Sequence, residues 1–495
     1  MNQLILRNRK KDYGMSIRIV TFGILLLLMS GAAFGQKPDR SSPPPLGFPG
    51  TLRLPAIQKF KLSNGLPVVL IEKGGVPIVQ INLLVKTGSA MEPMDRIGVA
   101  SMTAAMLDEG AGSRTALELA DAIDFLGARI TTGSGQHTSV IALHTPVSKL
   151  DAALPLMSDI ALRPTFPAEE LDRLRKERLT SLVQWHDQPG TIASVAFNQT
   201  LYGSRHPYGI PSLGNEQSLR TMKMSDLKHF HETYYNPNNV TLVVVGDVRI
   251  AEIQKKLESV YGGWKGRTTA SVNWTDATQV EQRIVYLIDK PGAAQSEIRI
   301  GRIGVSRMTE DYFPLVVMNT ILGGSFTSRL NQNLRETHGY SYGAGSFFDM
   351  RPLPGPFMAY SAVQTNVTDS ALSEFFKEFG NIQKSLPNEE FEKAKNYIAL
   401  GYPDNFESVS QIAGMLAEMI TFNLPDNYFN TYVSQVLAVK KEDVERVARE
   451  YVLPDKMAVI VVGDRAVIEK GIRGLNLGTV QVKSIEDILG KPPKL

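Results

Sequence analysis

An internal repeat constrains this 495-residue chain more than any other feature of its sequence. Residues 234–247 and 451–464 both begin Tyr-x-x-Pro and continue through a β-branched run that ends in Val-Val-Gly-Asp, and they are 217 positions apart. A second pair of segments, 166–171 and 386–391, reads Phe-Pro-Ala-Glu-Glu-Leu and Leu-Pro-Asn-Glu-Glu-Phe and is separated by 220 positions. Two separate matches at nearly one offset indicate a duplicated domain rather than a short solenoid repeat.

The repeat divides the chain into two homologous halves, which we place at residues 56–268 and 280–475, with a C-terminal tail at 476–495. Each copy of the repeated segment follows a predicted amphipathic helix, at 226–233 and at 443–450. The alternative is two unrelated α/β domains that end in similar buried strands. That alternative requires both pairs of matching segments to arise by coincidence at nearly the same offset.

The first half predicts strands, then helices, then a closing strand. Segregation of this kind indicates an α+β fold in which helices pack on one face of a mostly antiparallel sheet, and the repeat predicts the same arrangement in the second half. The expected strands are 67–72, 78–85, 128–134, 138–144 and 240–245, and the expected helices are 96–109, 116–126, 147–162, 167–186 and 223–234.

The N-terminus has the layout of a secretory signal peptide at residues 1–35. Basic residues precede an apolar run at 19–29, and the small residues Ala33-Phe-Gly35 predict cleavage after Gly35. Met15 is an alternative start, because residues 15–35 alone make a more compact signal. The alternative to cleavage is a membrane anchor that is retained.

Composition excludes several classes for the rest of the chain. Residues 36–55 are rich in Pro, Ser and Gly and predict an extended linker. Without residues 1–35 there are 48 basic and 49 acidic side chains, and such a near-neutral body lacks the field that nucleic acid binding requires. Past position 36 no apolar run is long enough to cross a bilayer. The chain has no cysteine, which excludes disulfides and thiolate metal sites. Together with the signal-like N-terminus, this fits an exported, periplasmic protein of a Gram-negative cell.

Four segments in the expected order resemble the pitrilysin-type M16 zinc peptidases, a group that includes mitochondrial processing peptidase. They are Leu-Ser-Asn-Gly-Leu-Pro-Val-Val-Leu at 62–70, His-Pro-Tyr-Gly at 206–209, the repeated segment at 234–247, and Leu-Gly-Gly-Ser-Phe-Thr-Ser-Arg-Leu-Asn-Gln-Asn-Leu-Arg at 322–335. The resemblance covers about 57–475. It implies a pair of similar α+β domains that form one half of a clamshell, with a second two-domain chain as the other half.

The zinc site of that family is lost in this sequence. Family enzymes hold zinc through an inverted His-x-x-Glu-His helix and a more distant Glu. Alignment of the flanking glycines puts Ser101 at the first His, Ala104 at the Glu, Ala105 at the second His, and Ser181 at the distant Glu. Methyl groups cannot coordinate Zn²⁺ and a neutral hydroxyl is a poor ligand, so the chain is expected to hold no metal and no other cofactor.

No other sequence pattern replaces the lost site. No two of the seven histidines are spaced three or four positions apart, and His229 and His231 on one predicted helix point to different faces. We find no nucleophile elbow, phosphate loop or paired-carboxylate pattern. The histidines are His137, His144, His186, His206, His229, His231 and His338.

The second half keeps residues that the family uses in catalysis. Arg335 and Tyr342 are seven positions apart, with Gly339 between them predicted to end a helix and begin a strand. The resemblance implies that such a pair reaches from the non-zinc half of the clamshell to the substrate carbonyl and the oxyanion, where a guanidinium and a phenol donate hydrogen bonds. The alternative is a surface Arg and a core Tyr. Nearby, Gly323, Gly324, Ser325 and Phe326 resemble the family's loop beside the substrate cleft.

The leading hypothesis is therefore a non-catalytic, Arg/Tyr-bearing subunit of a heterodimeric M16-type zinc peptidase, with zinc in the partner chain. The alternatives are a scaffold protein without a peptidase partner and, least supported, an autonomous metallopeptidase. The substrate is expected to be an extended peptide that adds to a sheet edge. The corresponding edge here, residues 129–135, is rich in Gly and small hydroxyls, so most peptide affinity is expected from the partner's edge.

Overall fold

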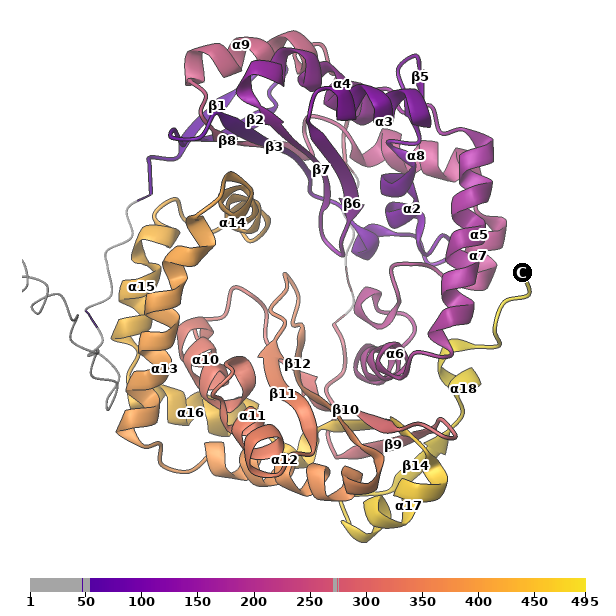
Figure 1. Cartoon of the computed structure of the whole chain (residues 1–495), viewed down its shortest axis with the longest axis vertical. Coiled ribbons are helices and arrows are strands. Elements are labelled where there is room, and N and C mark those ends of the chain that lie inside the picture. Colours follow the sequence, from indigo (N-terminus) through magenta and orange to yellow (C-terminus); the bar gives the residue numbers. More distant parts are fainter. Residues whose placement is uncertain (1–46, 48–53, 270–273, 275) are drawn as a thin grey trace, which may run out of the picture. The chain divides into compact units, whose positions relative to one another are not determined.

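The computed structural model describes residues 47, 54–269, 274 and 276–495 (Figure 1). The predicted signal peptide at 1–35 and nearly all of the predicted linker lie outside the described residues. Among the described helices, none has both the length and the apolar character needed to span a membrane. The described residues from 54 onward form one compact unit.

The first half contains a six-stranded sheet in the order β1-β2-β8-β3-β7-β6 (Figure 1). Its pairs are antiparallel except for β2 with β8, which run in parallel. The central strand β8 is buried along its whole length, whereas β7 alternates buried and half-buried residues, as expected for a strand with one face on a core. The strands are β1 (Gln58–Lys61), β2 (Pro67–Glu72), β3 (Ile78–Val85), β6 (Arg129–Ser134), β7 (Ser139–Pro146) and β8 (Val240–Gly246).

The described part of the first half contains the five helices that the sequence predicts and three more that it does not predict. The main helices are α2 (Val99–Met106), α3 (Ala116–Phe125), α4 (Leu150–Leu162), α5 (Ala168–Trp185), α6 (Pro189–Tyr202), α7 (Glu216–Thr221), α8 (Met224–Tyr234) and α9 (Ile250–Tyr261); short 3-10 turns are η2 (Ser89–Met91), η3 (Val147–Lys149) and η4 (Pro207–Gly209), and β4 (Gly110–Ala111) pairs with β5 (Arg114–Thr115). Helix α2 begins later than predicted because Gly98 has a left-handed φ of 88°.

The second half repeats this architecture with the sheet order β11-β12-β10-β13-β9-β14. Strands β9, β13, β10, β12 and β11 take the places of β2, β8, β3, β7 and β6, so β11 is the edge strand equivalent to β6. Two homologous α+β halves are therefore confirmed. The strands are β9 (Ile284–Asp289), β10 (Gln295–Ile303), β11 (Ser341–Phe348), β12 (Pro356–Gln364), β13 (Ala458–Gly463) and β14 (Val480–Lys483).

Strand β14 falls in the segment that the sequence analysis left as a C-terminal tail. It pairs in parallel with β9, and buried Val480 lies opposite Val285. A four-residue strand is too short for a clear period-two pattern, which is why the sequence analysis did not predict it.

The helices of the second half surround the same kind of core. They are α10 (Tyr312–Asn319), α11 (Arg329–Asn331), α12 (Thr368–Ile382), α13 (Asn388–Gly401), α14 (Val409–Thr421), α15 (Tyr428–Ala438), α16 (Lys441–Tyr451), α17 (Arg465–Gly474) and α18 (Ile485–Leu489); π-helical turns η5 (Thr320–Gly324) and η6 (Gln332–Thr337) flank α11, and η7 (Thr365–Val367), η8 (Tyr402–Phe406) and η9 (Pro454–Lys456) are 3-10 turns. The two predicted amphipathic helices at the repeat are α8 and α16.

Each half also supplies a helix to the sheet of the other. Helix α6 of the first half packs on β10 and β13, where buried Phe197 contacts the same core as Ile460. Helix α14 of the second half packs on β3 and β8, and Ser410 Oγ donates to Gln80 Oε1 over 3.0 Å. The two halves are therefore held together by a reciprocal exchange of equivalent helices.

Candidate functional site

The four positions that match the family's metal site serve structural roles in this chain. Ala104 is buried with 1% of its surface exposed, and Ala105 is partly buried on the same helix α2. Ser101 Oγ donates to the carbonyl of Ser212 over 2.6 Å, and Ser181 Oγ donates back to the carbonyl of Glu177 on α5. These side chains pack the helices or complete their hydrogen bonds.

A guanidinium lies beside the first vacated ligand position. Arg178 on α5 donates from Nη1 to Ser101 Oγ over 2.9 Å, and burial lowers its pKa to about 10. A fixed cation beside a vacated ligand opposes a divalent metal ion. Among the described residues there is no group of three His, Cys, Asp or Glu side chains close enough to hold a metal. The residues present do not fit a zinc ion.

A partly buried carboxyl group completes this cluster. Glu92 accepts hydrogen bonds from the backbone N–H groups of Gly98 over 2.8 Å and Ala100 over 2.7 Å, and so satisfies free donors at the start of α2. Burial raises the pKa of Glu92 to about 7, although these two hydrogen bonds and the nearby charge of Arg178 oppose the rise. Sequence analysis identified neither Glu92 nor Arg178, because no local pattern marks a charge that a fold brings to a lost site.

Arg335 and Tyr342 lie on neighbouring elements of the second half. Arg335 is in the π-helical turn η6, and its Cζ is 4.5 Å from the centre of the Phe326 ring. Gly339, with a φ of 64°, lies between η6 and β11, as the sequence predicted. Tyr342 is on edge strand β11 with 92% of its surface exposed, so the alternative of a core Tyr is wrong. No hydrogen bond of the Tyr342 hydroxyl occurs within the described part of the chain.

The predicted substrate loop is fixed to the same edge strand. A Cβ on Gly323 would lie 2.3 Å from the backbone nitrogen of Ser346, so only glycine permits this contact with β11. Asn319 reinforces it, because its Nδ2 donates to the Ser346 carbonyl over 3.0 Å. At Gly324 a Cβ would lie 2.7 Å from Asn319 Nδ2, and Ser325 Oγ donates to the Thr320 carbonyl. Packing against β11 thus accounts for the glycines, while their contact with substrate stays a prediction.

One buried side chain links the loop to the strand that carries Tyr342. Asn331 Nδ2 donates to the carbonyl of Phe326 over 2.7 Å, and Asn331 Oδ1 accepts from the N–H of Ala344 over 3.1 Å. Phe326 itself is 61% exposed beside Arg335. These contacts therefore hold Phe326, Arg335 and strand β11 together. Sequence analysis did not single out Asn331, although it lies within the recognised segment.

The strand predicted to bind peptide is an edge strand. Among the described strands β6 pairs with β7 alone, and its residues are exposed or half-buried throughout. It lies beside α2, as the resemblance implied. Peptide binding at this edge stays a prediction.

Two family models match the chain in succession. The model of the insulinase (peptidase family M16) domain matches residues 67–205, and the model of the peptidase M16 inactive domain matches residues 221–398.

Individual proteins match over larger shares of the chain. A crystal structure of a peptidase M16 inactive domain from Pseudomonas fluorescens superposes with a TM-score of 0.77 at 27% identity and covers 82% of this chain and 98% of that one. The uncharacterized zinc protease YmxG of Bacillus subtilis is 26% identical over 322 residues, 65% of this chain and 77% of its own. The non-peptidase homolog YmxG of Helicobacter pylori is 20% identical over 383 residues, 76% of this chain and 87% of its own.

Proposed function

Because the chain belongs to the peptidase M16 family, we propose that it is the non-catalytic subunit of a heterodimeric zinc peptidase. In this proposal the zinc is held by a partner chain with an intact His-x-x-Glu-His helix. This chain supplies Arg335 and Tyr342 across the interface. One observation carries the proposal: Tyr342 is 92% exposed on an edge strand whose position the surrounding loop fixes.

The two side chains suit the charge that develops in peptide hydrolysis. When water attacks a peptide carbonyl, negative charge collects on the carbonyl oxygen, and a zinc ion held by the partner would activate that water. The phenol of Tyr342 donates one hydrogen bond to that oxygen, and the guanidinium of Arg335 adds a positive charge and further donors. Removal of one such donor commonly lowers kcat by about 10²-fold to 10³-fold. Neither side chain is a metal ligand, so both depend on the partner for the attacking water.

The filled metal positions support the absence of activity in the isolated chain. Ala104 has only a methyl group where the family has its base, and Ser101 is hydrogen-bonded to Arg178, so this chain supplies neither the base nor the first ligand. The names of two similar proteins, an M16 inactive domain and a non-peptidase homolog, agree with this. We place the mature protein in the periplasm, on the strength of the signal-like N-terminus.

The test compares the purified chain alone with a reconstituted mixture. Metal analysis of the isolated chain should find no stoichiometric zinc, and a quenched fluorescent peptide should not be cleaved. Addition of a zinc-bearing homologue from the same organism should give cleavage that exceeds that of the homologue alone. One tightly held zinc per isolated chain with chelator-sensitive hydrolysis would overturn the proposal. Equal cleavage with and without this chain would favour the scaffold alternative.

A further inference from the structure

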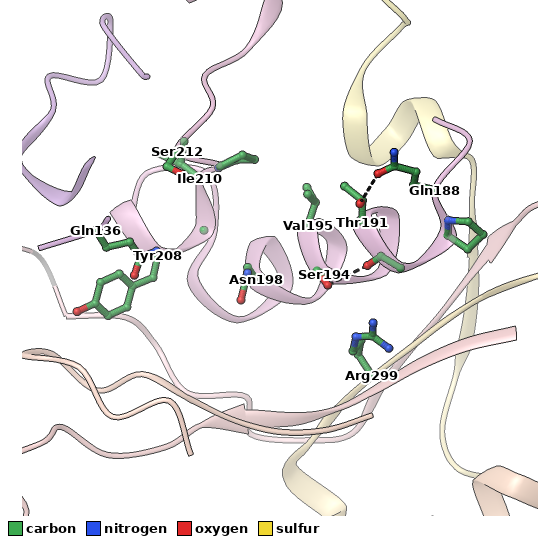
Figure 2. Close-up of a pocket in the computed structure, with 14 residues that line it drawn as sticks. Gln136, Gln188, Thr191, Ser194, Val195, Asn198, Tyr208, Ile210, Ser212 and Arg299 are labelled. Atoms are coloured by element: carbon green, nitrogen blue, oxygen red, sulfur yellow. Dashed lines mark hydrogen bonds between the residues drawn. The ribbon is translucent and has the colours of Figure 1, made fainter. Parts of the chain in front are cut away.

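A cavity of about 710 Å³ lies along the side of α6 that faces away from the core (Figure 2). Its other walls are the loop around Tyr208 to Ser212, Gln136, and Arg299 from β10. The apolar side of α6 packs on the second sheet through Ile192 and Phe197. The volume is within the range of sites that bind small molecules or short peptide segments.

The cavity adjoins both features that the family connects with substrate. Gln136 follows β6, the edge strand expected to pair with peptide. Ser212 accepts a hydrogen bond from Ser101, which lies at the first vacated ligand position. A peptide that added to β6 and continued past Ser134 would enter this cavity.

Neutral polar groups form most of the polar lining. Thr191 Oγ1 donates to Gln188 Oε1 over 3.0 Å, and Ser194 Oγ donates to the Gly190 carbonyl over 2.8 Å, so both hydroxyl protons are used by α6 and the residue before it (Figure 2). The side-chain amides of Gln136 and Asn198 make no hydrogen bond within residues 54–269 and 274–495 as far as the structure describes them. These amides are available to a peptide backbone.

Arg299 is the charged side chain of the lining, among the residues that the structure describes. Its Nη1 donates to Glu297 Oε2 over 2.8 Å and to the Ile298 carbonyl over 2.9 Å. Neither Nε nor Nη2 has an acceptor in the described part of the chain. Figure 2 shows the side chain rising from β10 toward α6. One edge of the guanidinium is therefore anchored, and the other is free for a second carboxylate.

We propose that this cavity is a peptide subsite in which Arg299 binds a carboxylate of the substrate. The carboxylate comes either from the C-terminus of the peptide or from an Asp or Glu side chain. This inference rests on the proposed function, because it assigns a preference to the peptide that the dimer cleaves. The amides of Gln136 and Asn198 hold the backbone beside the carboxylate.

The sheet register gives the spacing between this subsite and the Arg/Tyr pair. Arg299 lies opposite Tyr360 on β12, and Tyr360 lies opposite Gly345 on β11, three residues from Tyr342. Two regular strand spacings and three residues along a strand correspond to roughly 14 Å between the backbones of Arg299 and Tyr342, or about four residues of extended peptide. The register of β11 shifts between Ser341 and Ala344, so this spacing is an order-of-magnitude value. The preferred carboxylate is therefore about four residues from the bond that is cleaved.

The test measures binding of labelled peptides to the isolated chain by fluorescence anisotropy. Three versions of one octapeptide are compared: a free C-terminus without acidic residues, a C-terminal amide without acidic residues, and a C-terminal amide with one internal Glu. At least one carboxylate form should bind about ten-fold more tightly than the neutral peptide, and the better of the two identifies the source of the carboxylate. Equal affinity for all three peptides would overturn the proposal.

Variants connect the preference to Arg299. Arg299→Gln should reduce the ten-fold preference to less than two-fold. Because this change leaves Glu297 without its partner, the double variant Glu297→Gln/Arg299→Gln is measured as well and should behave alike. Arg283→Gln is the matched control, since Arg283 is also largely buried and pairs with one carboxylate, Asp455, outside the cavity. A preference that persists in the folded double variant would overturn the proposal.

The binding experiment contains no zinc-bearing partner, so it is independent of the catalytic proposal. A carboxylate preference together with a dimer that lacks enhanced cleavage would contradict the proposed function alone. Enhanced cleavage by the dimer without any carboxylate preference would contradict the subsite alone.

Discussion

Two regions of the chain differ in what surrounds their side chains. One is the lost metal site on α2 and α5. The other, the Arg/Tyr edge, comprises Arg335 and Tyr342 at edge strand β11. Ala104 is almost fully buried, and Ser101 is hydrogen-bonded to the Ser212 carbonyl and to Arg178. Tyr342, in contrast, is 92% exposed and has no hydrogen-bond partner among the described residues. The positions on α2 contribute to the fold of this chain, whereas Tyr342 contributes little to it. In the proposed function, the partner of the Tyr342 hydroxyl is the substrate at the neighbouring chain.

The largest expected effect comes from a charge introduced at the lost metal site. Ala104→Glu restores the residue type of the family's catalytic base, but it places a carboxylate in a buried helix face. We expect the free energy of unfolding to fall by about 4 kcal/mol, measured by urea denaturation. The matched change in the other region, Tyr342→Glu, should cost less than about 0.5 kcal/mol. Similar losses in both variants would remove the contrast between the two regions.

Glu92 predicts a pH dependence that belongs to the first region only. Its pKa is about 7 in the folded chain and about 4.5 when unfolded, so the folded chain binds this proton more tightly. The free energy of unfolding therefore falls as the pH rises from about 4.5 to 7, by up to about 3 kcal/mol. The difference in unfolding free energy between wild type and Glu92→Gln should follow this slope.

A control for the Glu92 prediction is available on α3. Glu118 is exposed, and hydrogen bonds from Thr115 lower its pKa, so Glu118→Gln should leave the pH window from 4.5 to 7 unchanged. Parallel pH profiles for wild type and Glu92→Gln would show that the carboxyl is not buried against Arg178.

Asn331 is hydrogen-bonded to the strand that carries Tyr342, so it tests the second of the two regions. Asn331→Ala removes two hydrogen bonds at a side chain that is 5% exposed, so the free energy of unfolding should fall by about 2 kcal/mol. Because these hydrogen bonds position β11, their loss should also lower kcat of the reconstituted dimer, although Tyr342 itself is unchanged. Asn405→Ala, at an exposed asparagine with one side-chain bond, is the control. A lower free energy of unfolding with an unchanged kcat would show that Asn331 does not position the Arg/Tyr pair.

The smallest effect is expected at Phe326, whose ring lies 4.5 Å from Arg335 Cζ. An exposed cation–π contact contributes about 0.5 to 1 kcal/mol, so Phe326→Leu should lower kcat of the dimer by about two-fold to five-fold. Phe326→Tyr retains the aromatic face and should restore the rate. If Tyr and Leu are equivalent at this position, the ring does not orient the guanidinium.

Much of the fold could be predicted because local patterns were strong. The β-branched runs at 67–72 and 78–85 coincide with β2 and β3, and the repeat predicted the equivalent sheet of the second half. The exchange of α6 and α14 could not be predicted, because a helix sequence shows which face is apolar but not which sheet it covers. Helix α6 was missed altogether, since Pro189-Gly190 at its start indicates a turn.

The candidate site was predictable only where a motif carried it. Arg335 and Tyr342 were identified by resemblance. The structure adds two features that the motif does not show: the Phe326 ring next to Arg335 and the hydrogen bonds of Asn331. Arg178 is far in sequence from Ser101, to which it donates a hydrogen bond. Arg299 is far in sequence from the α6 residues with which it lines the cavity. Such pairs depend on tertiary packing and leave no mark in a single sequence.

The most direct test of the account is the steady-state rate of the reconstituted heterodimer with changes at the Arg/Tyr pair. Tyr342→Phe and Arg335→Ala should each lower kcat by about 10²-fold or more, with a smaller change in KM and an unchanged free energy of unfolding. Tyr397→Phe, at another exposed tyrosine, should leave kcat unchanged. An unchanged kcat in the Arg335→Ala/Tyr342→Phe double variant would contradict catalysis across the interface and favour the scaffold alternative.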